Sequence, residues 1–265
     1  MGTSFGAVIP VTGPQVGFPG SVSRLGNPII TARQVLSTAA SSIPFGSPCV
    51  IIPNASGGGD TIDSVADFIA TAAANAGLVA SQFAGFAVRE VKTAITWPAG
   101  TTPGVLTVGS YQAGEEGELI EWGSCTVILA AGVPKSQQQV YTRVALNIAQ
   151  VPAGTVGDIE AISTAANDVV STTGTAASGT TLAVASPSNI QAGQIVSGAG
   201  IAPGTSVVSI NSSNVTLSLA VTAALSSTPV TFSNQVALPN VVFRTGFLDS
   251  STNAVEVTIK VRNAA

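Results

Sequence analysis

The sequence predicts a mainly β protein: an antiparallel β-sandwich or barrel base domain with one helix, plus a small inserted all-β module. Between residues 83 and 148, short runs rich in β-branched and aromatic residues, such as GELIEW, SCTVILA and QVYTRVAL, recur with turns at short intervals. Near the C-terminus, AVEVTIKVR alternates between apolar and polar residues, the pattern of an antiparallel strand with one buried face. Between Asp168 and Arg244 the chain has no charged residue, unlike its flanks.

The first 60 residues are rich in glycine and proline, in segments such as VTGPQVGFPG and IPFGSP. These residues interrupt helices, so we expect an extended N-terminal arm, turns and short strands. Phe5 and Phe18 are bulky residues of this arm. Because buried aromatics dominate the energetics of interfaces, both are candidate anchors for a partner. The alternative is that they cover the protein's own β core.

One helix is predicted over residues 61–76. Asp60 or Thr61 would cap its N-terminus, with Asp63 in the first turn, where the helix dipole favours a negative charge. Gly77 would end it. The apolar residues at helical spacing, which would pack on a sheet, are Ile62, Val65, Ala66, Ile69 and Ala73.

The alternating C-terminal run predicts which residues of the last strand are buried. One face would lie in the core and the other in solvent. The predicted core residues are Val255, Val257, Ile259 and Val261, and the predicted solvent-exposed residues are Glu256, Thr258, Lys260 and Arg262.

The charge-free stretch indicates a division of the chain. Its own short alternating runs and turns predict an all-β module over residues 171–234, inserted into a base domain formed by residues 1–170 and 235–265. The Gly/Ser/Thr-rich segment 171–179 and Ser233-Asn234 are suitable borders, and we expect the module to be separable.

Composition argues against several functions. A net charge of −4 with only nine scattered basic residues does not fit a non-specific nucleic-acid binder. No apolar run is long enough to span a membrane, and MGTSFGAVIPVTG lacks the basic and apolar regions of a signal peptide. We therefore expect neither a nucleic-acid nor a membrane partner, and synthesis in a cytoplasm.

The chain has no histidine, which removes the usual general base and metal ligand. The acidic residues Glu115, Glu116, Glu118 and Glu121 lie in one local segment, which indicates a solvated turn rather than the two separated carboxylates of a glycosidase. We expect no enzyme activity, no cofactor and no metal. Cys49 and Cys125 lie in apolar β-like runs and are interpreted as buried free thiols; a disulfide is the alternative.

Several segments, in order, resemble the phage structural cement (capsid decoration) protein family. They are GFPGSVS (17–23), IPFGSPCV (43–50), FAGFAVREVKT (83–93), YQAGEEGELIEWGSCTVIL (111–129), GVPKSQQQVYTRV (132–144), ALPNVVFRTG (237–246) and AVEVTIKV (254–261). The charge-free module is similar to β modules of phage and bacterial surface proteins.

The resemblance implies a structural virion protein on the capsid exterior, made in the host cytoplasm. Such a protein would bind the major capsid protein, bridge its subunits and stabilise the head, as a homo-oligomer that is either a dimer or a trimer. Two alternatives stay open. One is a phage tail, fibre or surface-layer subunit, which would share the low charge and the β modules. The other is a host-surface binding module, although the inserted stretch has no Trp or Tyr to bind glycans.

Overall fold

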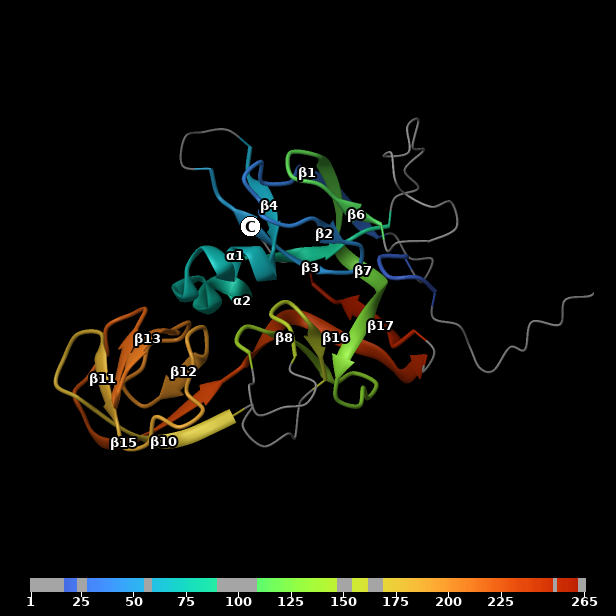
Figure 1. Cartoon of the computed structure of the whole chain (residues 1–265). Coiled ribbons are helices and arrows are strands. Elements are labelled where there is room, and N and C mark those ends of the chain that lie inside the picture. The colour runs from blue at the N-terminus through green and yellow to red at the C-terminus, as the bar shows by residue number, and fades with distance from the viewer. Residues whose placement is uncertain are drawn as a thin grey trace, which may run out of the picture.

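The computed structural model confirms the mainly β fold class. It describes residues 17–22, 28–54, 59–89, 109–146, 154–161, 169–249 and 252–261. Figure 1 shows two strand-rich parts with a short helical segment between them.

Five strands close into a small barrel. β7 (Glu116–Ala131) pairs with β17 (Ala254–Ile259), and the ring continues through β16 (Gln235–Asp249), β8 (Gln139–Arg143) and β9 (Ile159–Glu160). β9 returns to β7 as a parallel neighbour, whereas the other four pairings are antiparallel. All five strands contribute to one buried apolar cluster: Cys125, Val127, Leu129, Val140, Ile159, Leu238, Val241, Phe243, Val255, Val257 and Ile259.

The long strand β7 belongs to two parts of the sheet. Its first half pairs with β1 (Ile29–Gln34) and β5 (Phe83–Ala87), and its second half enters the barrel. The change of partner falls at Gly123, whose φ of +117° is a conformation that glycine adopts readily. From β5 the sheet extends to β3 (Pro48–Ile52) and β4 (Thr61–Ser64), while β2 (Ile43–Pro44) pairs separately with β6 (Ser110–Tyr111).

The prediction of one helix over 61–76 is wrong at both ends. Residues 61–64 form β4, because Ile62 pairs with Ile51 of β3 and is fully buried between strands. The helix α1 (Val65–Thr71) starts after Ser64, whose hydroxyl accepts a hydrogen bond from the Asp67 N–H at 3.1 Å. Asp67, rather than Asp63, is the acidic residue of its first turn.

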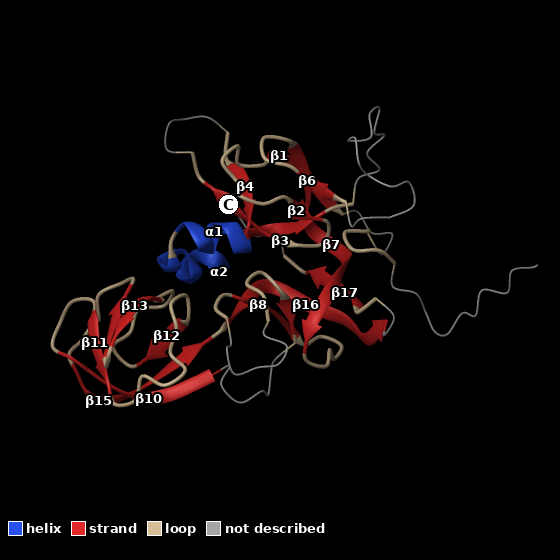
Figure 2. Ribbon diagram, viewed as in Figure 1, coloured by secondary structure: helices blue, strands red, loops and turns tan. Residues whose placement is uncertain are grey.

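Gly77 does not end the helical segment either. After Ala72 the chain continues as a 3₁₀ helix, η1 (Ala73–Leu78), and a short α2 (Val79–Gln82) that leads into β5. In Figure 2 these helices lie between the sheet of β3 and β4 and the strands of the charge-free stretch.

The charge-free stretch forms its own six-stranded antiparallel sheet, in the order β12-β15-β10-β11-β14-β13. The strands are β10 (Val169–Ala176), β11 (Thr181–Val184), β12 (Ile195–Gly198), β13 (Val207–Asn211), β14 (Asn214–Leu217) and β15 (Leu225–Ser233). It has a separate apolar cluster that includes Leu182, Val196, Val215, Val230 and Phe232. Only Asn234 separates β15 from β16, so one strand path joins this sheet to the barrel.

The prediction for the last strand is correct for Val255, Val257, Ile259 and Lys260, but not for Val261 or Glu256. Val255, Val257 and Ile259 are at most 1% exposed, as predicted. Val261 is 57% exposed because it lies beyond the end of β17, and Arg262 lies outside the described residues.

Glu256 was predicted to face solvent, but it is only 4% exposed. It lies opposite Thr126 of β7, which is itself fully buried. The carboxylate of Glu256 pairs with Arg244 at 3.4 Å, which provides a partner for the buried charge. Alternation therefore predicted the core face of the strand but could not show that Glu256, on the other face, is buried as well.

Candidate functional site

The segment GFPG carries Phe18 on a tight β-turn. The N–H of Ser21 donates to the carbonyl of Phe18 at 3.0 Å and closes the turn. Pro19 and Gly20 occupy the two central positions, and Gly20 has a φ of +76°. Proline followed by glycine at positive φ is the pattern of a type II turn.

Three backbone hydrogen bonds fix this turn to the sheet. Gly20 N–H donates to Thr126 O at 2.8 Å, Thr126 N–H donates to Ser21 O at 3.0 Å, and Arg89 N–H donates to Gly20 O at 2.8 Å. A Cβ at Gly20 would lie 2.8 Å from the carbonyl oxygen of Ala87. Glycine is therefore required twice here, for its conformation and for the close approach.

A second glycine turn packs against the first. In the segment IPFGSP, Ser47 N–H donates to Pro44 O at 3.1 Å, and Gly46 has a φ of +82°. Gly46 N–H donates to Ala87 O at 2.8 Å, and a Cβ at Gly46 would lie 3.0 Å from the nitrogen of Gly20. Two segments that are separated by residues 22–43 thus form one paired-turn site, comprising residues 17–21 and 44–47.

The two phenylalanines of the paired-turn site point to different environments. Phe45 is buried and packs edge-on against Tyr111, with ring centroids 5.1 Å apart, and the Tyr111 hydroxyl donates to Val88 O at 2.8 Å. Phe18, in contrast, is 60% exposed, and the guanidinium carbon of Arg89 lies 5.0 Å from its ring centroid. The site therefore presents an exposed aromatic ring next to a half-buried arginine, on a base that is anchored in the core. Phe5 lies outside the described residues.

A comparison with protein families identifies the chain. The family model described as structural cement protein (E217 gp24/Pam3 gp6) matches residues 9–197. The chain belongs to this family of phage structural cement proteins. A search of curated proteins found no match.

The cement-protein match includes both glycine turns, all of β1 to β11 and most of β12. It also extends beyond residue 170, into the stretch predicted to be an insert, and it does not include ALPNVVFRTG (237–246) or AVEVTIKV (254–261). Phage cement proteins are a structural family rather than an enzyme class.

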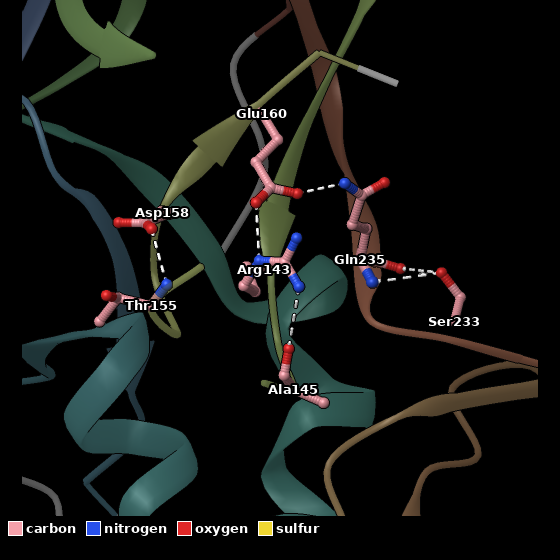
Figure 3. A network of polar contacts seen from close by, with 7 residues as sticks. All are labelled: Arg143, Ala145, Thr155, Asp158, Glu160, Ser233 and Gln235. Carbon is pink, nitrogen blue, oxygen red and sulfur yellow. Dashed lines mark hydrogen bonds and ion pairs between the residues drawn. The ribbon is translucent and has the colours of Figure 1, made fainter. Parts of the chain in front are cut away.

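A buried polar network lies where this cement protein's barrel meets the six-stranded sheet (Figure 3). Arg143 Nε donates to Glu160 Oε1 at 2.6 Å, and neither side chain is exposed. The side-chain amide of Gln235 donates to the other carboxylate oxygen, and Arg143 Nη1 donates to Ala145 O at 3.4 Å. The ion pair therefore joins the ends of β8 and β9 to the first residue of β16.

Two further carboxyl groups are partly desolvated, and one of them, Asp158, interacts with Arg143 of this network. Burial raises the pKa of Asp158, although the Thr155 N–H at 2.7 Å and the charge of Arg143 oppose the rise. Burial, with a smaller contribution from the charge of Asp67, raises the pKa of Asp63 to about 6, against a hydrogen bond from the Ser64 N–H.

Asp67 and Asp158 line a pocket of 270 Å³ together with serine hydroxyls. Both oxygens of Asp67 already accept hydrogen bonds from Ser41, at 2.6 Å from its N–H and 3.0 Å from its hydroxyl. Across the described ranges, no group of three or more potential metal ligands is found.

The acidic segment is a turn that leads into β7, as predicted, but one of its residues differs from the expectation. Glu116 is exposed, and Glu115 accepts a hydrogen bond from the Gln112 N–H at 2.7 Å within the turn. Glu121 is buried instead, and it pairs with Arg33 of β1 at 3.2 Å. Residues 115 to 121 extend along the strand and face different partners, so the four carboxylates do not form one cluster.

The two cysteines are buried free thiols, as interpreted from the sequence. Burial raises the pKa of both Cys49 and Cys125, which keeps them protonated and unreactive. Within the described part of the chain, no helix has the length and hydropathy needed to cross a membrane.

Proposed function

We propose that this protein binds the outer surface of a phage capsid, bridges neighbouring major capsid subunits and stabilises the head. The observation that carries the proposal is the family match over residues 9–197, because the family is defined by structural cement proteins. In this role the protein is a component of the virion exterior and needs neither a cofactor nor a metal.

Phe18 is the proposed anchor of the capsid contact. An exposed aromatic ring next to an arginine has the composition of interface hot spots, in which Trp, Tyr and Arg are enriched. The backbone hydrogen bonds of Gly20 and Ser21 hold the turn in place, so binding costs little conformational entropy. Phe18 thus offers an exposed apolar surface that is held in a fixed position.

The low charge of the chain sets the character of the contact. Only 8% of residues are charged, and residues 169–243 contain none. Apolar burial and backbone hydrogen bonds would therefore provide most of the affinity, and Debye screening would affect it little.

Many copies acting together would make a modest contact sufficient. A homo-oligomer, either a dimer or a trimer, would engage several capsid subunits at once, and linked contacts raise the overall avidity without a larger interface. Paired glycine turns that occupy little area fit this arrangement.

The test is co-sedimentation of the purified protein with undecorated heads and, separately, with isolated tails. We expect saturable binding to heads, and a several-fold weaker binding of the Phe18→Ala variant. Val133→Ala is the matched control, because Val133 is 73% exposed but lies outside the paired-turn site. Binding to tails alone would instead support a tail, fibre or surface-layer subunit.

A further inference from the structure

We propose that the helical segment 65–82 locks the charge-free sheet (residues 169–233, the insert sheet) to the barrel, so that the two move as one rigid body. The inference deepens the proposed function and rests on it for its role in bridging, but the joint itself can be tested on the free protein.

The first attachment is a contact between two glycines. Gly77 of η1 lies against Gly204, in the loop between β12 and β13. A Cβ at Gly77 would lie 1.8 Å from the carbonyl oxygen of Gly204, so not even a methyl group fits. From the other side, a Cβ at Gly204 would lie 3.0 Å from Gly77 O. The two backbones are in direct contact, and any side chain here would separate them.

The second attachment is the hydroxyl of Ser206. It lies 3.1 Å from Ala74 O and 3.3 Å from Ala73 O, at the start of η1, and Ser206 has no exposed surface. The backbone of Ser206 is itself fixed within the insert sheet, since its N–H donates to the Ser218 hydroxyl at 2.9 Å and its carbonyl accepts from Ser218 N–H at 2.8 Å. The insert sheet therefore donates a buried hydrogen bond to the helical segment.

The third attachment is Asn234, where β15 passes into β16. Asn234 is fully buried, and its carbonyl accepts hydrogen bonds from Val144 N–H at 2.8 Å and Ala145 N–H at 3.3 Å. Its side-chain oxygen accepts a hydrogen bond from Gln194 of the insert sheet at 2.8 Å. The crossing between the two sheets is thus held from both sides.

Apolar packing closes the space between these attachments. Ile195 of the insert sheet packs against a buried cluster that the helical segment forms with β3 and the chain after β8: Val50, Val65, Phe68, Ile69, Ala76, Val79 and Val144. Rotation about Asn234 would break the Gly77–Gly204 contact and the Ser206 hydrogen bond and would expose this cluster. The joint therefore resists bending, and a rigid two-part body can transmit force between capsid subunits, which a flexible tether cannot.

The experiment measures the distance distribution between two spin labels in the free protein by pulsed electron paramagnetic resonance. Ala130→Cys in β7 and Ser213→Cys in the β13–β14 turn are exposed labelling positions. The native Cys49 and Cys125 are at most 1% exposed, so they do not compete for the label. We expect one narrow distance peak.

Gly77→Ala is the decisive variant, because η1 does not place Gly77 at a positive φ and the atoms nearest to the added methyl all belong to Gly204 of the insert sheet. Gly59→Ala is its matched control, since a Cβ there has nothing within 4 Å. We expect Gly77→Ala to shift or broaden the peak and Gly59→Ala to leave it narrow. A broad peak in the parent protein, or an unchanged narrow peak in Gly77→Ala, would overturn the proposal.

Ser206→Ala provides a second test if Gly77→Ala does not fold. It removes the hydrogen bond to the helical segment without a steric clash, and we expect a broader peak than in the parent. Equal peaks in both proteins would contradict the joint. Neither measurement involves heads, so a protein that is rigid but does not bind heads would refute the proposed function and leave this inference intact.

Discussion

Arg143 and Glu160 form an ion pair at 2.6 Å in which neither side chain has exposed surface. The pair joins β8 to β9, and Gln235 satisfies the second carboxylate oxygen at the start of β16. Removing one partner would leave an uncompensated buried charge, whereas removing both would leave none.

We therefore expect Arg143→Met and Glu160→Leu each to lower the free energy of unfolding by about 3–5 kcal/mol. The double variant should cost clearly less than the sum of the two. Urea unfolding of the four proteins gives the coupling energy. Additive effects would show that the two charges do not depend on each other.

The C-terminal strand gives a second prediction, which the covered outer face modifies. Val257→Asp buries an unpaired charge in the barrel and should cost about 3–5 kcal/mol. Glu256→Gln should cost about 1–2 kcal/mol, because it removes the charge that pairs with Arg244 but keeps a polar group of the same shape. Thermal unfolding of both variants measures the difference, and equal losses would contradict the assignment of the two faces.

Sequence patterns identified the strands of this fold but not its contacts. Alternation gave the core side of Val255, Val257 and Ile259, and the glycine- and proline-rich segments predicted turns in the regions that contain Gly20 and Gly46. The burial of Glu256 could not be predicted, because it depends on the pairing of β17 with β16, which brings Arg244 next to its carboxylate. The spacing of Ile62 and Val65 also fits a helix. Residue 62 lies in a strand because it pairs with β3, and the sequence does not show that pairing.

The candidate site shows the same limit. Phe18 could be named as a candidate anchor because it is a bulky residue of the N-terminal arm. Nothing in the sequence indicated a role for Arg89, because the contact between the two side chains is set by the tertiary structure. The packing of Gly77 against Gly204 likewise had no sequence pattern beyond the glycines themselves. Two expectations stay predictions. One is that the inserted module begins at residue 171 and ends at residue 234, and the other is that the base domain folds without it.

The third prediction separates the two reasons why residue 20 must be glycine: its positive φ and its close contact with Ala87 O. Gly114, outside the paired-turn site, serves as the reference. Gly114 has a φ of +80°, and a Cβ there would have nothing within 4 Å, so Gly114→Ala reports the cost of conformation alone, about 1–2 kcal/mol. Gly20→Ala adds a clash with Ala87 O and should cost more. Unfolding free energies from urea titrations check this order, and the reverse order would refute the close packing of the turn.

The fourth prediction concerns pH. Burial raises the pKa of Asp63 to about 6 in the folded protein, above its ordinary value of about 3.9 in an unfolded chain. The folded state therefore holds a proton that the unfolded state releases, so the contribution of Asp63 to stability is greatest below about pH 4 and is lost as the pH rises through 6.

Asp63→Asn stays neutral and can still accept the Ser64 hydrogen bond. It should be more stable than the parent at pH 7.5, and this advantage should shrink as the pH falls towards 4.5. Asp60→Asn, at an exposed position, controls for the loss of one negative charge. A pH-independent difference between Asp63→Asn and the parent would show that burial does not perturb this carboxyl group.

The central claim is that the protein stabilises an assembled head, and the most direct measurement is the temperature at which heads release their DNA. Purified protein is added to undecorated heads at low and high salt, and DNA release is followed with a dye. A ligand that binds only the assembled lattice stabilises each site by roughly RT ln(1 + [L]/Kd), so many sites together should raise the release temperature. We predict a saturable rise of similar size at both salt concentrations. Heads that bind no protein, or that bind it and release DNA at an unchanged temperature, would contradict the assignment.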